Sequence, residues 1–331
     1  MSGDVERRVG EFRDHFNRVC EEVSRVIVGN DDVIAGVMTC LLVKGHVLLE
    51  GIPGVGKTKL VQTLADVTHL KFSRIQFTPD LMPGDIIGTN VVREDASGKK
   101  FFEFQQGPIF ANMVLADEIN RATPKTQSAL LEAMQENSVS AGGATHDLDQ
   151  PFFVLATQNP IEMEGTYPLP EAQMDRFLFK LRLDFPGPDQ LYNIVERTTQ
   201  QAEPDVARVL EQHQILEMRD TARSVPVAKP VMEYAIAITL ATHPESDKGH
   251  EMAKKYVRFG SSPRGVQSLI LGAKVNALIS GRVHVSCEDI RAVARPALRH
   301  RVLLNFEAEA ERIDTDEILN QILESVEEPK A

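Results

Sequence analysis

Glycines and a lysine between residues 51 and 58 have the spacing of a loop that binds phosphate. The segment Gly51-Ile52-Pro53-Gly54-Val55-Gly56-Lys57-Thr58 matches the pattern GxxxxGK[ST] at every fixed position. In such loops the backbone N–H groups wrap the phosphates, the lysine reaches the β- and γ-phosphates, and the Thr58 hydroxyl can bind Mg²⁺. The loop follows an apolar run and opens a helical pattern, which favours this interpretation over a glycine turn without function. The residues expected to contact the nucleotide are Gly51, Pro53, Gly54, Val55, Gly56, Lys57 and Thr58.

An apolar run that ends in two carboxylates lies one crossover after this loop. Met113-Val114-Leu115-Ala116 leads directly into Asp117 and Glu118. A carboxylate at the end of such a strand can bind magnesium through water, which is the role expected of Asp117. Glu118 can polarise an attacking water as a general base. Together with the phosphate-binding loop, these residues predict an ATPase that uses ATP and Mg²⁺.

Three further polar residues could take part in phosphoryl transfer. Asn159 follows the apolar run Phe153–Gln158, where it could hydrogen-bond the γ-phosphate, but asparagine before proline is also common in turns. Phosphoryl transfer commonly uses an arginine to neutralise transition-state charge, and Arg176 and Arg264 are candidates. The ordinary alternative for each arginine is a solvated or salt-bridged side chain. The residues alone leave both alternatives open.

The elements that must position these residues alternate between short apolar runs and helical stretches. Continuous apolar runs are typical of strands buried on both faces of a parallel sheet, so the first part predicts a doubly wound α/β fold. The predicted strands are His46–Glu50, Lys71–Phe77, Ala111–Asp117, Pro151–Asn159 and Leu178–Phe185, separated by helices such as Lys57–Leu70 and Pro124–Glu136.

Two segments interrupt this alternation and read as β-hairpins. Asn90–Gln106 has Asp95-Ala96-Ser97-Gly98 as its turn, and Asn137–Asp147 has Gly142-Gly143 at its tip. After Pro186-Gly187-Pro188, strand signals nearly vanish and helical patterns dominate. We therefore predict two domains, a core at residues 1–186 and a smaller, all-helical domain at residues 187–331.

Composition limits the class of protein. The 331-residue chain is 42% hydrophobic and 25% charged, which is typical of a globular protein. Its longest apolar run, Val33–Val43, is too short to span a bilayer, and the first residues carry no apolar signal core. We therefore expect a cytoplasmic protein. The net charge of −12 makes a general nucleic-acid binder an unfavourable interpretation, since such a protein needs a basic face.

The order of the motifs resembles the MoxR family of AAA+ ATPases. After the phosphate-binding loop come LADEINRA at residues 115–122, ATQNP at 156–160, EGTYPLPEAQMDRF at 164–177 and SPRG at 262–265. The resemblance runs from about Ile27 to about Val302 and keeps the order and spacing of the motifs. The stretch at 164–177 is far more specific than the phosphate-binding loop, which many nucleotide hydrolases share.

The resemblance implies roles for the polar residues. Asp117 and Glu118 would be the Walker B pair, and Asn159 would be sensor 1. Arg176 would be an arginine finger that reaches the ATP of a neighbouring subunit. Arg264 would be sensor 2, which brings the helical lid onto the nucleotide of its own subunit. In addition, Val28 and Gly29 would lie beside the adenine.

The resemblance also implies an architecture and a biological role. It predicts an AAA+ core with a five-stranded parallel sheet, a helical lid, and the two hairpins as inserts. MoxR-like proteins are expected to form a homohexameric ring, to remodel a protein client in a chaperone-like way, and to work with a von Willebrand factor A domain protein. A motor subunit of a metal-chelatase-like complex is an alternative. An ATP-dependent scaffold without turnover is another, although a pure binder has little use for Glu118, Asn159 and Arg176.

Overall fold

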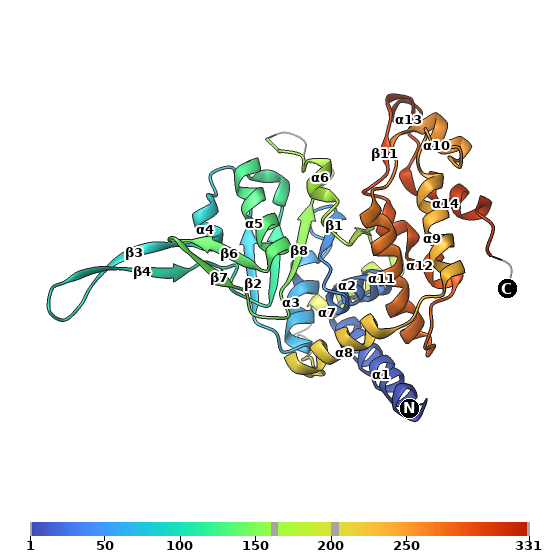
Figure 1. The fold of residues 1–331 in the computed structure, drawn as a ribbon. Helices are drawn as coiled ribbons and strands as arrows, with labels where there is room; N and C mark the ends of the chain where they lie inside the picture. The colour runs from blue at the N-terminus through green and yellow to red at the C-terminus, as the bar shows by residue number, and fades with distance from the viewer. Residues whose placement is uncertain (1, 160–164, 200–204, 330–331) are drawn as a thin grey trace.

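Five parallel strands form the central sheet, as predicted. The computed structural model describes residues 2–159, 165–199 and 205–329 of the chain. The strand order is β2-β5-β8-β1-β9, and every neighbouring pair is parallel (Figure 1). Each strand overlaps a predicted one; β1 has the predicted length but begins and ends one residue later, and the other four are shorter than predicted. The strands are β1 Val47–Gly51, β2 Phe72–Gln76, β5 Met113–Asp117, β8 Phe153–Gln158 and β9 Phe179–Leu183.

The pattern of burial follows the position of each strand in the sheet. All five residues of β5, a central strand, are buried. Met113 and Leu115 belong to the hydrophobic cluster on one face of the sheet, whereas Val114 and Ala116 belong to the cluster on the other. Successive side chains of a strand point to opposite faces, so a central strand must be apolar throughout. The edge strands β2 and β9 carry polar residues between apolar ones.

Helices cover both faces of the sheet. Those of the first part are α1 Ser2–Val26, α2 Asp31–Leu42, α3 Lys57–Val67, α4 Pro83–Ile87, α5 Pro124–Glu136 and α6 Glu171–Met174, with a 3-10 helix η1 at Ile119–Arg121. Buried residues of α2 and α3 belong to one hydrophobic cluster, and those of α4 and α5 belong to the other. The sheet therefore lies between two helical layers, and the predicted site residues follow the carboxyl ends of its strands.

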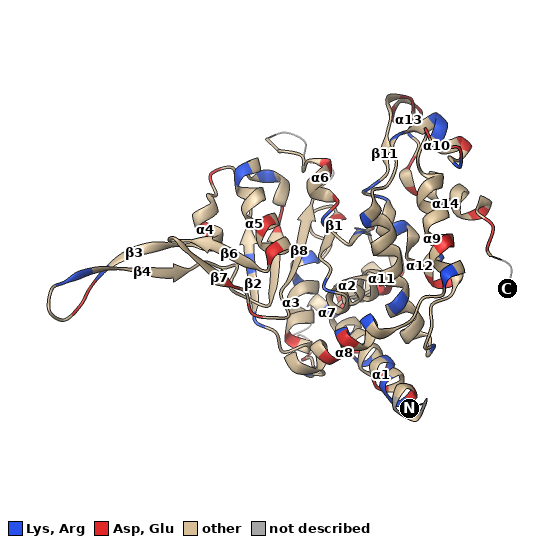
Figure 2. Cartoon of the chain, in the orientation of Figure 1, with Lys and Arg blue, Asp and Glu red and all other residues tan. Residues whose placement is uncertain are grey.

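Both predicted hairpins are present. The first pairs β3 Gly88–Glu94 with β4 Lys100–Gln106, and it projects far from the body (Figure 1). Its tip carries charged side chains of both signs (Figure 2). Asp95 fixes the turn, because its Oδ1 accepts hydrogen bonds from the backbone N of Ser97 and Lys99. The second, shorter hairpin pairs β6 Ser138–Ala141 with β7 Ala144–Asp147.

The C-terminal part is mainly helical, but it also contains a strand pair that we did not predict. Two and three residues are too few for a recognisable apolar alternation. The strands are β10 Val257–Phe259 and β11 Leu303–Leu304, which pair antiparallel. The helices are α7 Pro188–Thr199, α8 Gln212–Ser224, α9 Lys229–Ala241, α10 Glu251–Tyr256, α11 Pro263–Ile279, α12 Cys287–Leu298, α13 Phe306–Glu311 and α14 Thr315–Ser325.

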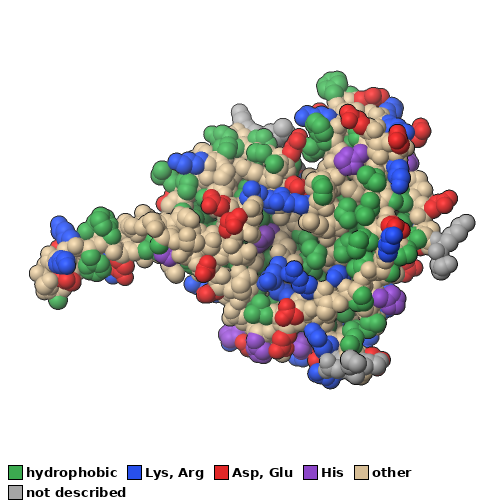
Figure 3. Space-filling view, viewed as in Figure 1, with side chains coloured by type: hydrophobic (Ala, Val, Ile, Leu, Met, Phe, Trp, Pro, Cys, Tyr) green, Lys and Arg blue, Asp and Glu red, His purple; other side chains and the backbone are tan. Residues whose placement is uncertain are grey.

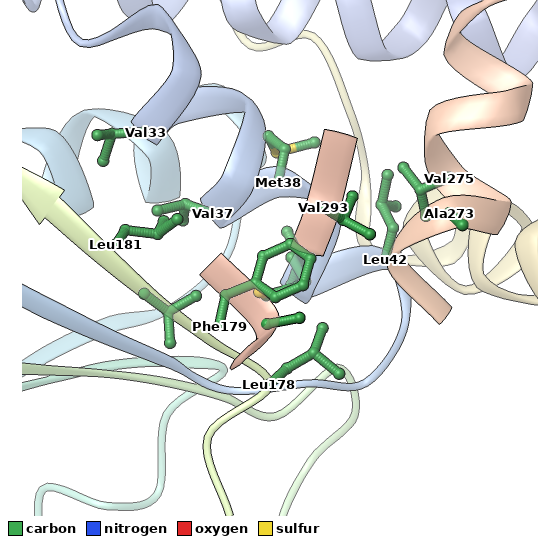
Figure 4. Close-up of a cluster of buried hydrophobic side chains, with 14 of the residues drawn as sticks. Val33, Val37, Met38, Leu42, Leu178, Phe179, Leu181, Ala273, Val275 and Val293 are labelled. Atoms are coloured by element: carbon green, nitrogen blue, oxygen red, sulfur yellow. The ribbon is translucent and has the colours of Figure 1, made fainter. Parts of the chain in front are cut away.

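The helical part packs directly on one face of the sheet. Figure 4 shows side chains of β9 among side chains of α2, α11 and α12. Phe179 of β9 lies so close to α11 that a Cβ on Gly272 would be 2.6 Å from its Cζ atom. One continuous hydrophobic cluster therefore joins the two parts, and α1 also packs against both α3 and α11. The domain boundary near residue 187 stays a prediction.

No helix within the described residues combines the length and apolar character that a membrane crossing requires.

Candidate nucleotide site

The glycine-rich loop between β1 and α3 has the backbone that phosphate binding requires. Gly54 and Gly56 have φ angles of +84° and +82°, a conformation that favours glycine. A Cβ on either residue would meet no atom within 4 Å, so the space over the loop is open. Helix α3 follows with no side chain capping its first turn. Its first N–H groups can therefore donate hydrogen bonds to an anion.

Lys57 lies buried at the start of α3. Its Nζ donates a hydrogen bond to the Gly51 carbonyl oxygen at 2.7 Å. Gly51 ends β1 and lies against β9, because a Cβ there would be 3.0 Å from the Leu183 Cβ. The Gly51 carbonyl thus holds the Lys57 side chain at the loop. A phosphate oxygen can replace this carbonyl oxygen as the acceptor of the lysine's hydrogen bond.

Asp117 and Glu118 are tied together by one side chain of the neighbouring strand. Thr157 of β8 donates a hydrogen bond from its Oγ1 to Asp117 Oδ1 at 2.7 Å. The same Oγ1 accepts a hydrogen bond from the Glu118 backbone N at 2.8 Å. Since β8 lies between β5 and β1, Thr157 fixes the two carboxylate residues at the strand edge next to the phosphate loop.

Two residues of the edge strand β2 also reach this pair. The Arg74 guanidinium donates to Asp117 Oδ2 from Nη2 at 2.7 Å and from Nε at 3.2 Å. Its Nη2 also donates to Gln76 Oε1 at 2.6 Å, and Gln76 Nε2 donates to Glu118 Oε2 at 3.0 Å. Sequence reasoning missed Arg74 and Gln76, because only the sheet order places β2 beside β5 and Gln76 opposite Asp117.

Glu118 has an unusual backbone conformation. Its φ and ψ of 55° and 50° lie in the left-handed region, at the start of η1. Such a conformation in a residue other than glycine costs of order 1–3 kcal/mol and is found at many functional sites. Its Oε2 accepts a further hydrogen bond from Arg121 Nη1 at 3.0 Å. Surrounding contacts therefore hold both the backbone and the carboxylate of Glu118.

Asn159 follows β8 directly and is buried. Its position at the strand edge agrees with the prediction, while its contact with a phosphate stays untested. Two residues of the predicted motifs lie outside the described part of the chain: residue 160, the last of ATQNP, and residue 164, the first of EGTYPLPEAQMDRF.

The two predicted arginines have their partners outside the phosphate loop. Arg176 follows α6, and its Nη1 donates to the Leu131 carbonyl oxygen of α5 at 2.9 Å. Arg264 is in the first turn of α11, with its Nη1 3.6 Å from Asp175 Oδ2. Among the described residues, neither arginine forms a hydrogen bond or ion pair with residues 51–58. The structure thus brings Arg264 next to the residue that precedes Arg176.

The segment that contains Val28 and Gly29 connects α1 and α2 and lies under α7. Gly29 has a φ of +72°, and a Cβ there would be 2.4 Å from the Gln190 Nε2 atom. Gln190 belongs to α7, and its Oε1 accepts a hydrogen bond from the Gly187 backbone N. The positive φ therefore favours glycine at position 29, where the end of the Gln190 side chain also lies close.

The residues present fit ATP with Mg²⁺. The open glycine loop, Lys57 and the N-terminus of α3 suit a polyphosphate. Mg²⁺ usually takes one or two protein oxygens and completes its shell with water and phosphate oxygens. Thr58 and Asp117 offer a hydroxyl and a carboxylate of this kind, on α3 and at the end of β5.

Comparisons with known proteins agree with this geometry. Residues 46–179 match the ATPase family associated with various cellular activities (AAA), and residues 250–322 match the AAA lid domain. The chain is 44% identical over 315 residues to Chaperone MoxR1 of Mycobacterium tuberculosis, covering 95% of this chain and 82% of that protein. It belongs to the MoxR family of AAA+ ATPases.

Other MoxR relatives match over nearly their full length. Protein MoxR of Methylorubrum extorquens is 30% identical over 339 residues, and the match covers 96% of each chain. A crystal structure of a protein from Cytophaga hutchinsonii superposes with a TM-score of 0.91 at 41% identity, over 99% of each chain. The fold of this chain is therefore shared with that structure over 99% of its length.

Proposed function

We propose that this MoxR-family protein hydrolyses ATP to ADP and phosphate at the carboxyl edge of its sheet. The observation that carries the proposal is the junction at Thr157 of β8, the strand next to β1 and its phosphate loop, which holds Asp117 and Glu118 together at the end of β5. Lys57 binds the β- and γ-phosphates, and Thr58 and Asp117 hold Mg²⁺. Glu118 takes a proton from the attacking water, and Asn159 orients that water. Bound Mg²⁺ neutralises charge on the phosphate oxygens.

Replacing Lys57 tests the phosphate site. Lys57→Ala removes a cation that touches phosphate already in the ground state, and hydrogen bonds to charged groups contribute about 1.5–3 kcal/mol. We therefore expect ATP affinity to fall by about 10- to 100-fold, measured by isothermal titration calorimetry. Lys59→Ala makes the same change two residues later on α3, where the side chain is exposed. Equal affinities for Lys57→Ala and Lys59→Ala would place the nucleotide elsewhere.

Arg74 must give way when Mg²⁺ reaches Asp117, because both cations need the same carboxylate. Arg74→Gln removes this competitor and is expected to lower the Mg²⁺ concentration that half-saturates ATP binding by about threefold or more, as expected for one ion pair near the surface. Binding of a fluorescent ATP analogue over a series of Mg²⁺ concentrations measures this value. Arg93→Gln, on the β3–β4 hairpin, is the matched control. An unchanged Mg²⁺ requirement in Arg74→Gln would mean that Arg74 does not compete with the metal.

We further propose that the protein acts as a homohexameric ring. Arg176 is held against α5 rather than by a described contact with its own phosphate loop, which supports a role for this arginine at the ATP of a neighbouring subunit. Arg264 would approach the ATP of its own subunit. ATPase activity per subunit should then rise with protein concentration, because association follows mass action.

The proposed biological role is chaperone-like remodelling of a protein client, together with a von Willebrand factor A domain protein. One relative carries the name Chaperone MoxR1, which supports this role. The β3–β4 hairpin offers a contact surface, since it projects from the body and exposes apolar side chains (Figure 3). Val92 and Phe102, which face each other across its two strands, are 60% and 74% exposed.

The two hairpins are connected by aromatic rings, and we propose that they respond together to the nucleotide. Phe104 of β4 stacks on His146 of β7 with ring centroids 4.1 Å apart, and Phe110 meets both rings edge-on. In addition, a Cβ on Gly142 at the tip of the second hairpin would be 2.5 Å from Asn90 of the first.

Truncating Phe104 should loosen the second hairpin. Stacked pairs contribute about 0.5–1.5 kcal/mol beyond the area they bury, so Phe104→Ala should raise amide hydrogen exchange in residues 138–147 by about two- to tenfold. Hydrogen exchange followed by mass spectrometry measures the change. Phe102→Ala removes a ring two residues away on the same strand and should leave these amides unchanged. Identical exchange in both variants would show that the stack does not hold the second hairpin.

A further inference from the structure

The carboxylate of Asp175 contacts three side chains of the helical part. Asp175 follows α6 and directly precedes Arg176. Its Oδ1 accepts hydrogen bonds from Ser262 Oγ at 2.7 Å and from Arg301 Nε at 2.8 Å. Its Oδ2 faces Arg264 Nη1 at 3.6 Å. Asp175 is thus the point where the start of α11 and the end of α12 both meet the segment that carries Arg176.

Arg301 holds the backbone around Arg176. Its side chain is only 2% exposed. Its Nη2 donates to the carbonyl oxygens of Asp175 at 3.0 Å and Phe177 at 2.7 Å, and its Nη1 donates to that of Leu178 at 3.1 Å. These carbonyls lie on both sides of Arg176. A guanidinium of the helical part therefore fixes the peptide units that orient Arg176.

The two arginines at Asp175 are held with different strength. The Arg264 side chain is 46% exposed, and within the described part of the chain its ion pair is the looser one at 3.6 Å. Exposed pairs of this kind contribute about 0–1 kcal/mol, so a phosphate can attract Arg264 at little cost. The buried Arg301 stays with Asp175, which prevents an uncompensated buried charge. Asp175 can therefore release one arginine while keeping the other.

The start of α11 transmits such a movement to Asp175. Ser262 caps this helix, because its Oγ accepts a hydrogen bond from the Arg264 backbone N at 3.2 Å. The same Oγ donates to Asp175. In the next position a Cβ on Gly265 would overlap the Ser261 Oγ, so this turn packs tightly. A shift of Arg264 would thus displace Ser262 and, through it, the carboxylate beside Arg176.

We infer that Asp175 is a positioning residue through which the helical part of each subunit sets the orientation of the Arg176 that the subunit lends to its neighbour. This inference rests on the proposed function, in which Arg176 acts on the neighbour's ATP and Arg264 on its own. Through this contact, the rate of ATP hydrolysis at one site depends on the helical part of the adjacent subunit. The relevant surface is the contact between residues 175–178 and the segment that follows α12.

A mixture of two inactive variants isolates this role. Glu118→Gln subunits cannot hydrolyse their own ATP but can donate Arg176, and Arg176→Ala subunits can accept it. Adding Asp175→Asn to the donor should lower the restored ATPase rate by about tenfold or more, because ångström-scale misplacement can cost about 10²-fold. The ATP concentration that half-saturates the acceptor should not change, since its own site is intact.

Asp314→Asn in the donor is the matched control. Asp314 also connects the helical part with the sheet, because it accepts hydrogen bonds from Arg182 of β9. It is distant from Arg176 in the sequence, and neither of its two hydrogen bonds with Arg182 involves residues 175–178. Asparagine remains a good helix cap at this position, so the control should keep the restored rate within about twofold. Thermal unfolding checks that each donor is folded. If Asp175→Asn does not fold, Ser262→Ala, which removes one of the three contacts, should lower the rate by about threefold or more.

The outcomes separate this inference from the proposed function. If the parent pair restores no activity although subunits exchange, action of Arg176 on a neighbour is wrong. If the parent pair restores activity and the folded Asp175→Asn donor restores as much, the positioning role is wrong. Equal losses from Asp175→Asn and Asp314→Asn would also overturn it, because they would reflect a general weakening of the contact between the two parts.

Discussion

Replacing Glu118 with glutamine is expected to slow ATP turnover by about 10²–10⁴-fold, because it removes a positioned general base. Glutamine has nearly the same shape, and its carbonyl oxygen can still accept hydrogen bonds from Arg121 and Gln76, which contact Oε2 in the structure. The variant should therefore fold normally and retain its left-handed turn. ATP affinity should stay within about threefold, since a base acts in the transition state rather than in binding.

Phosphate release and ATP binding, measured on the same preparation, check this result. Glu233→Gln makes the same change on the exposed face of α9 and should behave as the wild-type protein. Full turnover in Glu118→Gln would remove Glu118 from the catalytic step. A parallel loss of ATP affinity would instead assign Glu118 to nucleotide binding.

Replacing Arg176 with alanine has the largest expected effect on rate. Arginine fingers contribute about 10³–10⁵-fold to phosphoryl transfer, so Arg176→Ala should be nearly inactive at saturating ATP. Its own phosphate loop and Walker B residues are unchanged, and it should therefore bind ATP normally as an isolated subunit. The truncation also removes the hydrogen bond to the Leu131 carbonyl oxygen, which contributes about 1 kcal/mol to stability.

Steady-state ATPase assays and thermal unfolding separate the two effects in Arg176→Ala. Arg25→Ala removes an arginine from an ordinary surface ion pair with Glu22 and should keep normal activity. An Arg176→Ala protein that is folded and retains more than about a tenth of the wild-type rate is incompatible with a finger role.

The sequence alone predicted those parts of the site whose chemistry depends on local backbone. The loop at residues 51–58 is recognisable because two of its glycines, at 54 and 56, take positive φ angles and its lysine follows at a fixed spacing. The central strands were predictable because both faces are buried, which requires an unbroken apolar run such as residues 113–116. The hairpins were predictable from their turns, where Asp95 and the pair at 142–143 fix the backbone locally.

The parts that could not be predicted depend on contacts between distant segments. Arg74 is an ordinary polar residue of an edge strand until the sheet order places it beside Asp117, 43 residues later. Arg301 carries no motif, and only the packing of the helical part brings it to Asp175, 126 residues away. Such pairs follow from topology rather than from any local spacing. The strand pair β10–β11 was missed because its strands are too short to show a period.

The central claim is that the catalytic site is shared between two MoxR-family subunits, with Glu118 from one and Arg176 from the next. The ATPase rate of Glu118→Gln mixed with Arg176→Ala over a series of ratios tests it most directly. The account predicts that activity appears only in mixtures and peaks near equal amounts, where roughly a quarter of the interfaces in a closed ring join an intact site to an intact finger. A rate that stays at the level of the separate variants, while fluorescently labelled subunits demonstrably exchange, would contradict the account.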